Sequence, residues 1–161
     1  MKKRRSPTFS PTYSRLEIMS ASSTAPMPQE SRDHQLMRIH AALMAMETAE
    51  VPTPDDFQVV GNVVNIMETI VAEGWALDEE GLLKMADGAL GESWKRRQRG
   101  EAIRLDGPGR QAVCAVLAIY ETFLNRLSER NLKYAHSVTE RRIWEVVHGR
   151  GRPGDVLLAG R

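Results

Sequence analysis

The segment that most constrains the fold begins at Thr53 and ends near Gly74, because its apolar residues cover two adjoining faces of a helix. It opens with the sequence Thr-Pro-Asp-Asp at residues 53–56, which supplies a capping hydroxyl, a proline suited to the first helical position and two carboxylates. Gly74 is a typical C-terminal stop. The two apolar rows are Phe57, Val60, Val64, Met67 and Val71, and Val59, Val63, Ile66 and Ile70. A helix this apolar is buried at the centre of a domain or at an interface between subunits.

Apolar residues recur with the helical period of about 3.6 through most of the remaining chain. An acidic start at residues 78–80 and a cap and turn at residues 105–109 mark the openings of two further helices. The expected helices span residues 31–50, 53–74, 78–99, 109–127 and 131–148. No segment alternates with period two, and the chain contains no internal repeat. The sequence therefore predicts an all-α fold, a compact bundle of about five helices.

The chain divides into three parts by composition. Residues 1–30 carry Ser-Pro and Ala-Pro pairs and a serine-rich run without apolar periodicity, so we expect a disordered basic segment there. Residues 31–148 form the helical domain. Residues 149–161 are rich in Gly and Arg, and we expect a short flexible tail.

The N-terminal cluster Lys2–Arg5 resembles the start of a secretory signal, but the residues that follow it are polar and broken by proline. We therefore expect no secretory signal and a cytoplasmic protein. The apolar runs are far shorter than the roughly 18–20 residues that cross a bilayer, so no membrane association is expected. Met19 is an alternative translation start to Met1, and the mass of the native protein would distinguish the two.

The formal net charge of +1 conceals a strong segregation of charge along the chain. Residues 1–30 carry a net charge of +3, residues 31–94 carry −9, and residues 95–161 carry +7. Such a distribution affects how partners approach the protein more than the total does. The balanced total argues neither for nor against nucleic acid as a ligand.

The outer face of the last helix is one candidate for a binding surface. Cations and an aromatic residue follow one another at helical spacing, a pattern that suits phosphate backbones or an acidic partner. These residues are Arg130, Lys133, Arg141 and Trp144, with Arg142 alongside. The alternative is an ordinary solvated helix face, because Glu140 and Glu145 interrupt the pattern.

Two further basic stretches are candidates for nucleic-acid contacts. The densest run is Lys95, Arg96, Arg97 and Arg99. Its cations either neutralise phosphates or complement the negative end of the preceding helix. A helix-turn-helix within residues 82–99 is a weak alternative, because the glycines fall inside the helix. The sequence Arg-Gly-Arg-Pro at residues 150–153 resembles the core of an AT-hook, in which Arg150 and Arg152 would enter the minor groove. The competing interpretation is a flexible tail in which Asp155 would repel phosphate.

Residues for catalysis or metal binding are not arranged in any known motif. The histidines form no metal-binding pair; they are His34, His40, His136 and His148. No nucleophile elbow, phosphate loop or dinucleotide fingerprint is present. We therefore expect no enzyme activity, no bound metal and no cofactor.

Several polar and sulfur-containing residues fall within the predicted core. Cys114 is surrounded by Ala and Val, so we expect a buried thiol, and a single cysteine excludes an intramolecular disulfide. Asn62 and Asn65 are expected to specify packing of the central helix. The helices also carry many methionines, at positions 37, 44, 46, 67 and 85, which suit a core or an adaptable partner groove.

Three short stretches resemble a known group of proteins: Val-Val-Asn-Ile-Met-Glu at residues 63–68, Ile-Arg-Leu-Asp-Gly-Pro-Gly at 103–109 and Thr-Glu-Arg-Arg-Ile at 139–143. The chain resembles short helical proteins of betaproteobacterial plasmids and integrative elements, some of which are labelled Fis family transcriptional regulators. The similarity covers most of residues 35–150. The label implies a C-terminal helix-turn-helix, whereas the one candidate here lies mid-chain. The resemblance therefore implies a context, an accessory protein of a mobile element, and no site residues.

The function that we expect is that of a non-enzymatic helical adaptor or regulatory protein that acts by protein–protein interaction. Its partner is another protein or a second copy of this chain, since two of the predicted helices are almost wholly apolar. The alternative is a DNA-binding transcriptional regulator that uses the basic C-terminal half.

Overall fold

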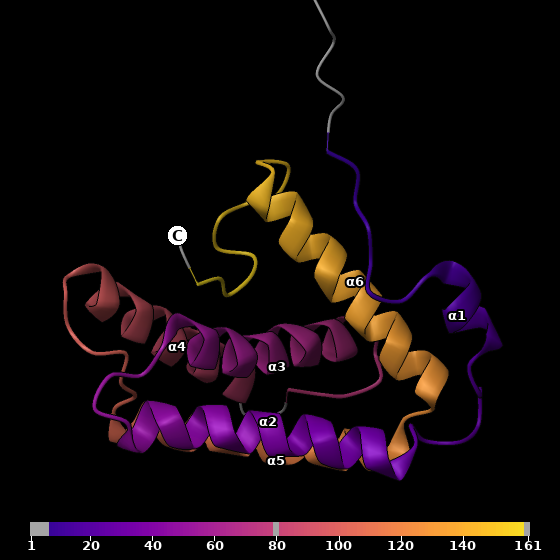
Figure 1. Ribbon diagram of the computed structural model, residues 1–161, viewed down its shortest axis with the longest axis horizontal. Helices are drawn as coiled ribbons and strands as arrows, with labels where there is room; N and C mark the ends of the chain where they lie inside the picture. The colour runs from indigo at the N-terminus through magenta and orange to yellow at the C-terminus, as the bar shows by residue number, and fades with distance from the viewer. Residues whose placement is uncertain (1–6, 79–80, 160–161) are drawn as a thin grey trace, which may run out of the picture.

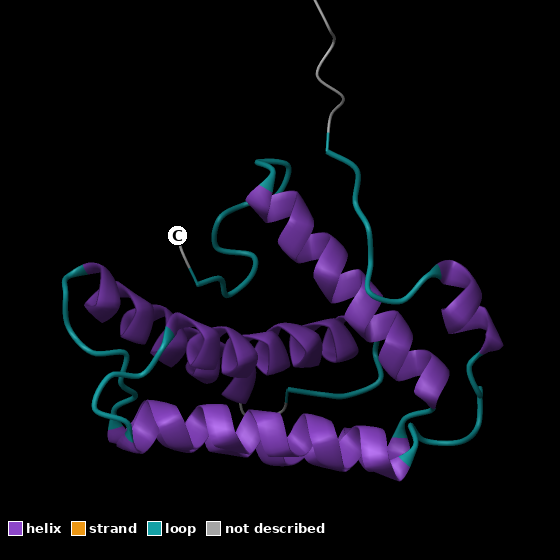
Figure 2. Ribbon diagram, viewed as in Figure 1, coloured by secondary structure: helices purple, strands orange, loops and turns teal. Residues whose placement is uncertain are grey.

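The computed structural model describes residues 7–78 and 81–159. The described residues form six helices and no strands (Figures 1 and 2). They are α1 Arg15–Ser20, α2 Gln29–Thr48, α3 Pro54–Ala72, α4 Leu82–Gln98, α5 Gly107–Arg126 and α6 Glu129–Val147. The predicted all-α bundle is confirmed, and α2 to α6 are the five helices expected from the periodicity.

Side-chain caps explain why most helices begin where they were expected. Thr53 and Asp56 form a reciprocal capping box at the start of α3. Asp106 accepts from the backbone N–H of Gly109 at 2.7 Å and opens α5. Ser128 accepts from the backbone N–H of Asn131 at 3.2 Å and opens α6.

The start of α4 differs from the expectation. The helix begins at Leu82 rather than at Asp78, after Gly81 in the left-handed conformation with φ 64°. Asp78 nevertheless takes part, because its Oδ1 accepts from the backbone N–H of Leu83 at 3.2 Å. A left-handed residue cannot continue an α-helix, so Asp78 precedes the helix instead of lying in its first turn. Glu79 and Glu80 lie outside the described residues.

Helix α3 is the centre of the bundle and contacts α2, α4, α5 and α6. In Figure 1, α2 and α5 form a layer on one side of α3, and α6 crosses α3 on the other side. Most of α3 is buried, including Val60, Val64 and Ile70, none of which exposes any surface. Of the two positions that the sequence left open for this helix, the structure shows the centre of the domain.

The N-terminal segment is ordered from residue 7 onward, which corrects the expectation of disorder for residues 1–30. Residues 7–28 run alongside α6 in space, and Met27 is 4% exposed. The free N–H groups at the start of α6 donate to this segment, that of Glu129 to the carbonyl of Ala25 at 2.8 Å and that of Arg130 to Ser22 at 3.1 Å. The few apolar residues of the segment have no period of their own, and Met27 is buried because it joins the hydrophobic core formed by other parts of the chain. Residues 1–6 lie outside the described residues.

The C-terminal tail is also ordered, against the expectation of a flexible end. It returns to α3, where Val156 and Leu157 are buried. Asn65 binds the tail in both directions: its Nδ2 donates to the carbonyl of Leu157 at 3.1 Å, and its Oδ1 accepts from the Leu157 N–H at 2.9 Å. Ala159 donates from its backbone to Gln58 Oε1 at 2.7 Å. A side-chain amide has both a donor and an acceptor, so Asn65 satisfies the backbone N–H and C=O of Leu157 as a neighbouring β-strand would.

Candidate functional site

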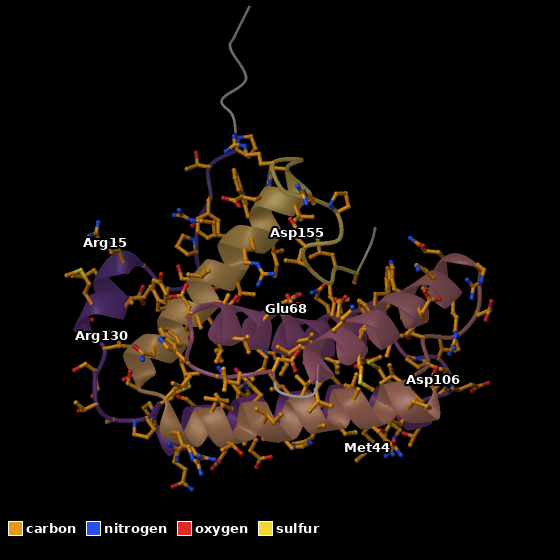
Figure 3. All side chains as sticks on the ribbon, turned by 180° about the vertical axis from the view of Figure 1, so that it is seen from behind. Arg15, Met44, Glu68, Asp106, Arg130 and Asp155 are labelled. Atoms are coloured by element: carbon orange, nitrogen blue, oxygen red, sulfur yellow. The ribbon has the colours of Figure 1, made fainter. Side chains whose placement is uncertain are left out.

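The first half of the predicted α6 surface is covered by the N-terminal segment. Arg130 donates from Nη2 to the carbonyls of Met19 at 2.9 Å and Ala21 at 3.0 Å, so it holds the C-terminal end of α1 (Figure 3). Lys133 pairs with Glu129 at 2.8 Å and lies 5.3 Å from the centre of the Tyr13 ring. These two cations stabilise the fold and are not available as a continuous basic stripe.

Arg142 is half-buried and is bound to other parts of the chain rather than being free on the helix surface. Its Nη1 donates to Thr69 Oγ1 at 3.0 Å, and its Nη2 donates to Glu68 Oε2 at 3.0 Å and to the carbonyl of Asp155 at 2.8 Å. One guanidinium group therefore joins α3, α6 and the C-terminal tail. Burial raises the pKa of Glu68, although Arg142 donates to its carboxylate. Figure 3 shows Glu68 and Asp155 on the same side of α3.

An aromatic cluster holds the remaining residues of that face at the end of α6. Trp144 stacks on His148 with ring centres 4.2 Å apart and meets the edge of Phe9 at 6.0 Å. Arg150 lies over the Trp144 ring at 4.8 Å, and Arg141 lies over the Phe9 ring at 5.5 Å. The structure thus brings together Arg141, Trp144 and Arg150, which the sequence places on two different segments.

The basic run at the end of α4 is largely paired within the chain. Lys95 pairs with Glu92 at 2.6 Å, and Arg99 pairs with Glu101 at 2.9 Å. Arg96 donates to the carbonyl of Arg104 at 3.2 Å, whereas Arg97 is exposed. Helix α4 is continuous across Gly88 and Gly91, so residues 82–98 contain no helix-turn-helix.

The Arg-Gly-Arg-Pro stretch forms a compact turn rather than the extended conformation of an AT-hook. The backbone N–H of Arg150 donates to the carbonyl of Glu145 at 2.7 Å, and that of Arg152 donates to Asp155 Oδ2 at 3.1 Å. A Cβ on Gly151 would lie 2.9 Å from Val146, so the turn packs closely on α6. Entry of both arginines into a minor groove would require this turn to open.

A buried tyrosine of α5, Tyr120, meets the half-buried His136 of α6. The Tyr120 hydroxyl lies 3.5 Å from His136 Nε2, and burial raises the pKa of Tyr120 and lowers that of His136. Both side chains are therefore predominantly neutral at pH 7 and act as polar groups of the core. Cys114 is half-buried rather than fully buried, which differs from the expectation.

Sequence reasoning missed Arg104, which closes the C-terminal end of α2. Its guanidinium donates to the carbonyls of Glu47 at 2.9 Å and of Ala49. Nothing in the local sequence marks this role, because Arg104 lies more than 50 residues from its acceptors. The only local signal is the position of Arg104 in a loop that precedes a cap.

The described residues contain neither a cluster of metal-binding side chains nor a membrane-spanning helix. Among residues 7–78 and 81–159, no three His, Cys, Asp or Glu side chains are grouped in a way that would hold a metal ion. None of the helices in the described part of the chain has the length and apolar content needed to span a membrane.

Comparisons with known proteins found no match to this chain among protein-family models, curated proteins or solved structures. The fold and the surface chemistry of the chain are therefore the basis for a functional proposal. The features that remain are an outward row of methionines on α2, the basic aromatic cluster at the end of α6, and a groove between α4 and the tail.

Proposed function

We propose that the protein is a non-enzymatic helical adaptor in the cytoplasm that binds an apolar helix of a partner protein on the outer face of α2. The observation that carries this proposal is a row of exposed apolar residues at i, i+4 and i+7 on that helix: Met37, Ala41 and Met44. Met37 is 65% exposed and Met44 is 62% exposed. Met44 lies at the edge of the molecule away from α3 in Figure 3.

The opposite face of α2 already supplies the residues that the bundle core needs. Ile39, Ala42 and Met46 are buried there. A surface helix normally presents polar residues on its outer side, so apolar residues on both sides indicate a second packing surface. Methionine is unbranched and polarizable, and it adapts to the shape of a partner helix.

A groove of about 1040 Å³ continues this surface at the start of α2. Tyr13, Met27 and Met37 contribute its apolar lining; its charged lining residues are Glu30, Asp33, Glu129, Arg38 and Lys133. Because this lining carries charges of both signs, the apolar surface is the feature that a partner helix would complement.

A photo-crosslinking amino acid in place of Ala41 tests the adaptor proposal. We expect one host protein to be cross-linked through a segment with apolar residues at helical spacing. For the purified pair, Met37→Glu together with Met44→Glu should weaken binding by about 100-fold or more, because each of the two buried Met side chains contributes about 1.5–3 kcal/mol. Isothermal titration calorimetry measures this change.

Met85→Glu is the matched control, since Met85 is 52% exposed on α4. This variant should bind with unchanged affinity. Equal losses in the control, or the absence of any cross-link from position 41, would contradict the proposal. Cross-links only between two copies of this chain, with a matching change in sedimentation, would replace the partner protein with a dimer.

A second candidate function, nucleic-acid binding, is supported by the cluster at the end of α6. Phe9, Arg141, Trp144 and Arg150 line a groove of about 320 Å³, together with Glu145. No carboxylate of the described residues pairs with the Arg141 or Arg150 side chains. A guanidinium group over a ring keeps its in-plane N–H donors free for phosphate.

Pro7, the first described residue, also lines this groove. The rings of Trp144 are already stacked, which favours contact with the phosphate backbone over base stacking.

Fluorescence anisotropy with a mixed-sequence 20-base-pair duplex, titrated with salt from about 50 mM, tests nucleic-acid binding. Arg141→Gln with Arg150→Gln should reduce the slope of log K against log salt by about 2. The control, Lys95→Gln with Arg97→Gln, removes the same charge elsewhere and should retain the slope. Equal losses in both variants, or no binding at about 50 mM salt, would exclude a phosphate site at this position.

A further inference from the structure

A groove of about 520 Å³ lies between α4 and the C-terminal tail. Phe57 and Trp94 form one wall, with ring centres 4.8 Å apart, and Val156 and Leu158 of the tail form the other. Figure 1 shows the tail turning back over α3 on the side of α4. A groove of this size with mostly apolar walls matches the usual dimensions of a small-molecule site.

The floor of the groove is open because Gly88 and Gly91 lie in it. A Cβ built on either glycine would meet no atom within 4 Å. Glycine in the middle of a helix costs about 0.5–1 kcal/mol relative to alanine, and no packing within the chain requires it here. The two glycines leave space beside the aromatic wall that side chains would otherwise fill.

Asp87 lines the same groove and is half-buried without a cation or hydrogen-bond donor from any described residue. Burial raises its pKa. The nearby Glu68 has Arg142 as its partner, and Lys95 on the groove edge pairs with Glu92. An uncompensated carboxylate in a partly desolvated position is unfavourable, so the arrangement lacks a positive charge.

We propose that this groove binds an organic cation, an ammonium or guanidinium group on an apolar body, with Asp87 as its counter-ion. The cation would pair with the carboxylate while its apolar body rests on the glycine floor against Phe57 and Trp94. Aromatic faces attract cations in addition to providing apolar contact, and this attraction is strongest at Trp. The chemistry is shared by a free amine and by a Lys or Arg side chain of another protein.

The site does not depend on the adaptor or nucleic-acid proposals. It lies on α3, α4 and the tail, whereas Met37 and Met44 lie on the outer face of α2. Variants of α2 should therefore leave cation binding unchanged, and failure of one proposal leaves the other standing.

The test uses benzyltrimethylammonium and agmatine as probes, followed by amide chemical shifts of the full chain. We expect saturable shifts at Asp87, Gly91 and Leu158 with a Kd of about 1 mM or tighter. Benzyl alcohol, which has an aromatic ring but no charge, should bind at least about 10-fold more weakly. A capped Gly-Arg-Gly peptide tests the second source: tighter binding of the peptide identifies a partner's side chain, and tighter binding of agmatine identifies a free amine.

Two substitutions separate binding from folding. Asp87→Asn should weaken binding of both cations by about 10-fold and should leave the unfolding midpoint unchanged or raised, because it removes an uncompensated charge. Gly91→Leu should fill the groove, abolish binding and leave the fold intact. The controls are Asp55→Asn, at an exposed carboxylate of α3, and Gly107→Leu, at another glycine with open space, and both should retain binding.

The absence of saturable shifts with either cation and the peptide would overturn the proposal. Equal affinity of benzyl alcohol and benzyltrimethylammonium would also overturn it, since the pocket would then recognise only the ring. So would cation binding that survives in both Asp87→Asn and Gly91→Leu.

Discussion

Arg142→Ala is expected to lower the free energy of unfolding by about 3 kcal/mol. Arg142 joins three parts of the chain, through Thr69, Glu68 and the carbonyl of Asp155. Its removal leaves the half-buried carboxylate of Glu68 without a cation. Breaking such a pair by deleting one partner costs more than the pair contributes, because the remaining charge stays desolvated. Urea denaturation at pH 7 measures the change in the free energy of unfolding.

The neighbouring variant Arg141→Ala is the matched control for Arg142→Ala. The Arg141 guanidinium lies over the Phe9 ring, an exposed contact worth about 0.5–1 kcal/mol. Replacing Glu68 by Gln in the Arg142→Ala background should recover part of the loss, because the stranded charge is then absent. A loss below about 1 kcal/mol for Arg142→Ala, or no recovery in the double variant, would show that Arg142 does not compensate Glu68.

Gly109→Ala is expected to destabilise the protein by about 2 kcal/mol. A Cβ at this position would lie 2.6 Å from the Cβ of Ala89 on α4 and 2.7 Å from Asp106 Oδ1. The same Oδ1 accepts from the Gly109 N–H and caps α5. The methyl group would therefore separate α4 from α5 and displace the cap together. For a chain of this length the melting temperature should fall by about 4–8 °C, measured by circular dichroism.

Gly107→Ala, two residues earlier in the same turn, is the control for Gly109→Ala. Its Cβ would meet no atom within 4 Å, so we expect a change of less than about 0.5 kcal/mol. Ala89→Gly in the Gly109→Ala background should restore part of the stability by removing one of the two clashes. Similar melting temperatures for Gly109→Ala and Gly107→Ala would contradict close packing at Gly109.

The helices were predictable because their signals are local. The capping residues Thr53, Asp106 and Ser128 act within three residues of their own position. The apolar rows of α3 also identify it as a buried helix, although they do not distinguish the centre of the domain from an interface between subunits. The predicted start of α4 was wrong. Asp78 accepts a hydrogen bond from the backbone N–H of Leu83, and Gly81 between them is left-handed, a geometry that composition alone does not specify.

The candidate binding residues were harder to predict because their partners are distant in the sequence. Arg130 was expected on an open surface, but it binds carbonyls of α1 more than 100 residues earlier. Arg142 shares a helix with Arg141, yet Arg142 is half-buried against α3 whereas Arg141 lies on the surface over Phe9. Periodicity assigns a residue to a face of its helix, but it does not reveal which segment later covers that face.

The sequence by itself determined the all-α class, the five long helices and the burial of both apolar rows of α3, because hydrophobic period and capping act over a few residues. The place of α3 at the centre of the bundle came from the tertiary structure. Tertiary structure alone decided that residues 7–28 cover α6 and that the tail binds Asn65. It also decided that Asp87 lies in a groove formed by segments far apart in the chain, without an ion-pair partner among residues 7–78 and 81–159. The physical reason is that these features depend on burial and hydrogen bonds between distant residues, and such contacts exist only after the helices have assembled.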